Sequence, residues 1–113
     1  MNDKFQKLIS DLNTKTQAKP EIWDKTAGEN CIHTFFQSYG VRICKYDYFN
    51  GVTAINFAIL DMNGSNIDEI DFFEEEENDK IEFSTLLTIF NAAKRRLINL
   101  DSIINTLIEE VNN

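Results

Sequence analysis

The chain has 113 residues, of which 42% are hydrophobic, and a formal net charge of −8. This length is typical of one domain, so we expect residues 1–113 to form a single domain around one core. No apolar run reaches the roughly 18–20 residues of a membrane helix, and the polar start of the chain lacks the apolar part of a signal peptide. We therefore expect a cytoplasmic protein that makes no membrane contact.

The negative charge is concentrated in one segment. Residues 61–80 contain nine acidic residues and one lysine, whereas the rest of the chain has ten acidic and ten basic residues. The acidic segment therefore accounts for the whole net charge. Because like charges repel, it disfavours direct binding to the backbone of a nucleic acid.

The first predicted element is a helix over residues 3–16, because its apolar residues have the spacing of one helix face. These residues are Phe5, Leu8, Ile9 and Leu12. Pro20 ends the polar stretch that follows, since proline cannot continue a helix. Trp23 comes next in a short extended piece, and we expect its ring to fill one end of the core.

Alternation of apolar and polar residues predicts a strand over residues 31–39 and three further strands up to residue 73. Asn-Gly pairs at residues 50–51 and 63–64 suit the tight turns of an antiparallel meander. The residues predicted to face the core are Val41, Ile43, Ile55, Phe57, Ile59, Ile70 and Phe72. Cys31 and Cys44 could lie on neighbouring strands. Two cysteines in a small chain fit a reducing compartment, so we interpret them as buried free thiols.

Two helices are predicted after the sheet. Ser84 or Thr85 caps a helix that runs to about Ile98, and Asp101 caps a last helix. The fold class is therefore α+β: an N-terminal helix, an antiparallel meander of about four strands, and two C-terminal helices packed on one face of the sheet. The last helix has an apolar stripe that could instead join a second copy, which would make a homodimer. This stripe consists of Ile104, Leu107, Ile108 and Val111.

Several segments occur in an order that resembles a known group of proteins. They are Ile-Trp-Asp-Lys-Thr at residues 22–26, Val-Arg-Ile at 41–43, Ile-Asn-Phe-Ala-Ile at 55–59 before the second Asn-Gly pair, and residues 87–95 with the closing amphipathic helix. The chain from Ile22 onward resembles small, functionally uncharacterised proteins of bacterial phages and other mobile elements. The resemblance implies a mobile-element origin and an α+β fold, and it supplies no activity or catalytic residue.

The sequence offers no convincing metal, cofactor or catalytic site. A calcium-type loop beginning at Asp61 has its glycine at the fourth position instead of the sixth and Phe72 at the twelfth. Cys31, His33 and Cys44 lack the paired short spacings of a structural zinc site. His33, the only histidine, shares a strand with Cys31, but no glycine-rich loop or helix start is placed to form an oxyanion hole. We therefore expect no enzyme and no concave site; a deep pocket lined by His33 and several charged groups would contradict this.

We favour a non-enzymatic, acidic binding protein that regulates or blocks another protein, as an inhibitor or a counter-defence protein does. Spaced carboxylates would present a phosphate-like row to a basic protein partner, and binding would be fast and sensitive to salt. The predicted partner-binding residues are Asp68, Glu69, Asp71, Glu74, Glu75, Glu76 and Glu77. The simpler interpretation of the same residues is a solvated charged loop.

The alternative is an oligomeric protein that binds or sequesters a small anionic ligand, such as a signalling nucleotide, between protomers. Aromatic side chains would stack on the base and an arginine would pair with the phosphate. The residues predicted for this role are Tyr46, Tyr48, Phe49 and Arg95.

Overall fold

The computed structural model describes residues 3–28 and 30–113 and confirms the α+β class. In chain order its elements are α1 (Asp3–Ala18), a 3₁₀ turn (Pro20–Ile22), β1 (Asp24–Lys25), β2 (Cys31–Phe35), β3 (Gly40–Asp47), β4 (Thr53–Leu60), β5 (Asn66–Phe73), a second 3₁₀ turn (Glu77–Asp79), α2 (Lys80–Leu97) and α3 (Leu100–Val111). The described residues form five strands instead of the predicted four, because the two residues of β1 pair with β2.

The strands form one antiparallel meander in the order β1-β2-β3-β4-β5. The predicted Asn-Gly turns join β3 to β4 and β4 to β5. Gly51 and Gly64 have φ angles of 86° and 84°, a left-handed conformation that glycine adopts without a Cβ penalty. The two turns therefore fix where the three longest strands reverse, and an irregularity between Ile59 and Leu60 shifts the register of β4 and β5.

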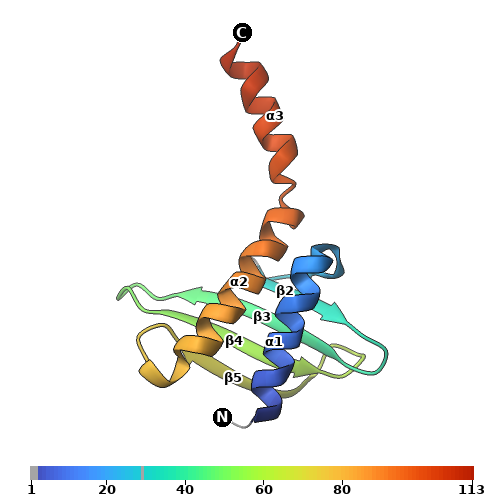
Figure 1. The fold of residues 1–113 in the computed structure, drawn as a ribbon, viewed down its shortest axis with the longest axis vertical. Coiled ribbons are helices and arrows are strands. Elements are labelled where there is room, and N and C mark those ends of the chain that lie inside the picture. Colours follow the sequence, from blue (N-terminus) through green and yellow to red (C-terminus); the bar gives the residue numbers. More distant parts are fainter. Residues whose placement is uncertain (1–2, 29) are drawn as a thin grey trace.

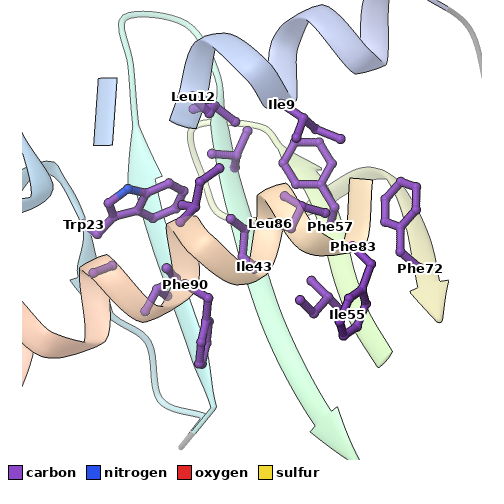
Figure 2. Close-up of a cluster of buried hydrophobic side chains, with 14 residues drawn as sticks. Ile9, Leu12, Trp23, Ile43, Ile55, Phe57, Phe72, Phe83, Leu86 and Phe90 are labelled. Carbon is purple, nitrogen blue, oxygen red and sulfur yellow. The ribbon is translucent and has the colours of Figure 1, made fainter. Parts of the chain in front are cut away.

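Helices α1 and α2 lie across the same face of the sheet (Figure 1). Figure 2 shows their apolar side chains meeting those of the strands in one layer. Of the predicted core-facing residues, five are at most 5% exposed and two, Ile59 and Ile70, pack at the border of the layer. Burial of each large apolar side chain contributes about 1.5–3 kcal/mol, so this layer is the main source of stability.

Trp23 fills one end of the core, as predicted. Its side chain is 1% exposed, and its Nε1 donates a hydrogen bond to Thr16 Oγ1 over 2.9 Å. The Thr16 hydroxyl in turn donates to the Leu12 carbonyl over 2.7 Å. The indole N–H is therefore satisfied in a place that water does not reach.

Helix α2 begins earlier than predicted. It follows Asp79 and starts at Lys80, so the prediction of a cap at Ser84 or Thr85 was wrong. Phe83 lies in the first turn and packs in the core. Its burial stabilises helical structure before Ser84 and Thr85, whose hydroxyl groups had suggested a later start. Asp79 Oδ2 accepts a hydrogen bond from the Phe73 backbone N–H over 2.9 Å, and this contact joins the helix start to the end of β5.

Helix α3 does not pack on the sheet. The prediction that both C-terminal helices pack there is therefore correct for α2 and wrong for α3. Residues 102–111 are exposed, and Figure 1 shows α3 projecting from the body of the molecule. Asn99 has a φ of 53°, a left-handed conformation that ends α2 and redirects the chain. The prediction that Asp101 caps this helix was wrong, because α3 starts at Leu100 and Asn99 is its N-cap residue. In the described chain, none of the helices combines the length and apolar character needed to cross a membrane.

Candidate binding surface on the open sheet face

Within the part of the chain that the structure describes, the sheet face opposite α1 and α2 carries no helix, and we call it the open face (Figure 1). Side chains alternate along a strand, so every second residue of the meander points to this face. Its central residues are Cys31, His33, Phe35, Arg42, Cys44, Tyr46, Asn56, Ala58, Glu69 and Asp71. The register aligns them in rows across the strands: Arg42 lies opposite Ala58, and Ala58 lies opposite Glu69.

Asn56 is the centre of a polar network on the open face. Its Nδ2 donates to Asp71 Oδ1 over 2.8 Å and, more weakly, to Glu69 Oε2 over 3.5 Å. Glu69 Oε2 also accepts from Asn66 over 3.0 Å and lies 3.6 Å from Arg42 Nη2. Two carboxylates thus contact a single amide, and a guanidinium contacts one of the two carboxylates.

Two atoms of this network are buried and make no hydrogen bond within the described structure. They are Arg42 Nε, a donor, and Asn56 Oδ1, an acceptor. Asn56 as a whole is only 7% exposed. An unsatisfied buried polar atom costs about 1–3 kcal/mol, so the fold keeps these two atoms at a cost to its own stability.

The open face is hollowed beside the network. The hollow has a volume of about 660 Å³ and lies between the β1–β2 connection, residues 26–28, and the β4–β5 turn, residues 62–64. His33, Phe35 and Tyr46 line it together with the Cys31–Cys44 pair and one charged residue, Arg42. The ring of Phe35 packs edge-on against that of His33 at 5.1 Å. This hollow is open, and Arg42 is the one charged side chain among the described residues that line it. It is therefore not the deep pocket with several charged groups that would contradict the expectation.

The two cysteines form a disulfide bond, so the interpretation as free thiols was wrong. Cys31 and Cys44 are directly opposite each other in the β2–β3 ladder, with Cα atoms 4.1 Å apart and an S–S distance of 2.01 Å. Antiparallel register brings opposed side chains together regardless of their separation along the chain. The bond ties β2 to β3 at the hollow of the open face.

The predicted partner-binding residues are all exposed, but they do not form one row. Glu69 and Asp71 lie in the network of the open face, whereas Asp68 lies opposite Ile59 on the helix-covered side of β5. Residues 74–77 lie in the connection between β5 and α2, where Glu77 pairs with Lys80 at 2.9 Å. The acidic segment therefore borders the open face along β5, an edge strand of the sheet.

The residues predicted for the anionic ligand lie in two places. Tyr46, Tyr48 and Phe49 are at the β3–β4 hairpin, and Tyr46 lines the hollow of the open face. Arg95 is on α2, across the sheet, where it lines a separate hollow of about 470 Å³ with Arg96 and the end of α1. A single chain does not bring Arg95 to the aromatic residues.

Sequence reasoning missed Arg42 and Asn56 because only the apolar face of each strand was interpreted. Both residues lie at alternate positions between apolar neighbours, which is the signal that assigns them to the opposite face. A polar residue in each of two adjacent inner strands indicates that this face is not a second apolar core.

Comparisons with known proteins give no assignment: no family model, no curated protein and no solved structure matches the chain. Within residues 3–28 and 30–113, no group of three His, Cys, Asp or Glu side chains is placed to hold a metal ion.

Proposed function

We propose that this is a non-enzymatic binding protein that regulates or blocks another protein through its open face and the adjoining acidic strand β5. One observation supports this most strongly: an exposed sheet face presents a rigid, charged network with two unsatisfied buried atoms beside a hollow with aromatic walls. Exposed aromatic rings and a preorganised polar centre are typical of surfaces that bind proteins.

The charges on this face favour a partner with a basic surface. Glu69 and Asp71 outnumber Arg42 in the network, and residues 74–77 add four acidic side chains beyond the end of β5. A lysine or arginine of the partner would donate to the exposed carboxylates of Glu69 and Asp71. Association would be steered by charge and weakened by salt.

The origin of the protein in a phage or another mobile element, which the resemblance implies, belongs to the same proposal. A cytoplasmic location is also part of it. The disulfide removes the support that the cysteine count gave to that location, because disulfides persist mainly in oxidising compartments.

The test begins with the full chain, immobilised and exposed to a bacterial extract to capture the partner. The purified partner is then titrated to measure its dissociation constant. The double variant Glu69→Gln and Asp71→Asn should weaken binding by about tenfold or more, since each charge-assisted hydrogen bond contributes about 1.5 kcal/mol or more. The control, Asp11→Asn with Glu21→Gln, makes the same change in net charge away from the open face. Equal binding by the two double variants, or affinity independent of salt, would contradict the proposal.

A second candidate is an oligomer that binds a small anionic ligand. It is favoured by the hollow beside α1 that both Arg95 and Arg96 line. Because Arg95 and the aromatic hairpin are on opposite sides of the sheet, this function needs two chains. A bound nucleotide should raise the melting temperature. A screen of nucleotides at saturating concentration with no such rise would exclude it.

A further inference from the structure

Helix α3 has an apolar face that the described chain leaves uncovered. Five of its residues, Ile103, Ile104, Leu107, Ile108 and Val111, are between 43% and 81% exposed. At about 100° per residue they occupy an arc of roughly 140° on the helix. Ile98, just before α3, is another exposed apolar side chain at 45%. So large an apolar face marks a site of association.

A helix of this kind is not stable by itself. α3 has 12 residues, and isolated helices shorter than about 12–15 residues are marginal in water. Figure 1 shows that neither the sheet nor α1 lies beside it. The helix therefore requires burial of its apolar face against another molecule.

The charges of residues 94–113 favour a second copy of the chain as the molecule that covers α3, with the two helices antiparallel. Lys94, Arg95 and Arg96 form a basic end on α2, whereas Glu109 and Glu110 form an acidic end on α3, and no lysine or arginine follows Arg96. Two copies paired in parallel would place acidic end beside acidic end. Two antiparallel copies place each acidic end beside the basic end of its partner, which is favourable at both ends.

We propose that two copies of the chain dimerise by antiparallel pairing of α3 about a two-fold axis. Placing Glu110 near Arg95 of the partner sets the two-fold axis near the start of α3. The same arrangement brings Leu107 near Ile98 of the partner, so apolar residues meet between the charged ends. Because Asn99 interrupts the helix, the overlap consists of the last turn of α2 and the whole of α3.

This dimer is independent of the proposed function, because it leaves the open face of each copy free. The charge change at Glu69 and Asp71 should therefore leave the dimer intact.

Sedimentation equilibrium on the full chain tests the apolar contact. The wild type should be a dimer, and Leu107→Asp with Ile108→Asp should be a monomer with an unchanged sheet signal in circular dichroism. The control, Asn105→Asp with Thr106→Asp, adds the same charge to the polar side of α3 and should remain dimeric. A wild type that is monomeric at its highest soluble concentration would overturn the proposal, as would a variant that dimerises as tightly as the control.

A charge exchange tests the direction. Arg95→Glu with Arg96→Glu should raise the dimer dissociation constant by about tenfold, and so should Glu109→Lys with Glu110→Lys, because four exposed pairs are reversed. Combining all four changes should restore the wild-type value. A combined variant that dimerises no better than its two parents would exclude antiparallel pairing.

Discussion

The Cys31–Cys44 disulfide should contribute a large share of the stability of the fold. The bond closes a loop with a sequence separation of 13 residues. In the chain-entropy model, a loop of this size lowers the entropy of the unfolded chain enough to stabilise the fold by roughly 3 kcal/mol. Small domains have total unfolding free energies of about 5–15 kcal/mol, so reduction should remove a substantial part. For 113 residues this corresponds to a fall in melting temperature of roughly 12 °C.

Urea unfolding of the oxidised and the reduced protein measures this contribution with identical side chains in both samples. Trp23, the only tryptophan, reports the transition by its fluorescence. Mass spectrometry confirms the oxidation state through the mass of two hydrogen atoms. The variant Cys31→Ala with Cys44→Ala is the control, since a reductant should leave its transition unchanged. Equal midpoints for the oxidised and reduced wild type would refute the reasoning.

Two further predictions concern the core and the open face. Thr16→Val should lower the unfolding free energy by about 1–3 kcal/mol, because it leaves the buried Trp23 N–H without an acceptor. The control Thr14→Val removes an exposed hydroxyl bonded to Ser10 and should change the unfolding free energy by less than about 0.5 kcal/mol. Equal urea midpoints for the two variants would contradict this. Gly40→Ala should cost about 1–3 kcal/mol because the new methyl would lie 2.4 Å from Phe35 Cδ1, whereas Gly28→Ala, with no neighbour closer than 3.4 Å, should be nearly neutral in thermal unfolding.

The sheet could be predicted because its signals are local. Alternation with a period of two identified the core-facing residues, and the Asn-Gly pairs identified the turns. β1 was missed because two residues are too short for any period. The start of α2 was missed because packing of Phe83, and not the nearest hydroxyl, determines it. A stripe such as that of α3 predicts that a face is buried but not what covers it, so its placement on the sheet was wrong.

The candidate surface could be predicted only in part. Composition was enough to place the acidic residues on the exterior. Composition could not show that Glu69 and Asp71 both contact Asn56, because they are 13 and 15 positions away from it along the chain. The disulfide was missed for the same reason, since it depends on which residues lie opposite each other. In each case the missing information was the register between strands.

Asn56 offers a way to separate a binding role from a structural one. Its Oδ1 is buried without a partner, while Asp71, to which its Nδ2 donates, is exposed and can bond to water instead. Asn56→Val removes the unsatisfied atom and adds a β-branched side chain that suits an inner strand. We therefore expect a stability in urea that is unchanged within about 0.5 kcal/mol or higher, as is common when a residue serves binding.

The same variant should bind the partner more weakly, because Glu69 and Asp71 lose the amide that donates to both of them. Asn66→Val, which also removes a side-chain amide that donates to Glu69, is the control at the exposed start of β5. If Asn56→Val instead loses more than about 1 kcal/mol of stability and binds as tightly as the control, Asn56 holds the sheet together and the network is structural. Weaker binding with unchanged stability would instead mean that Asn56 serves the proposed binding surface, because it holds the two carboxylates in place.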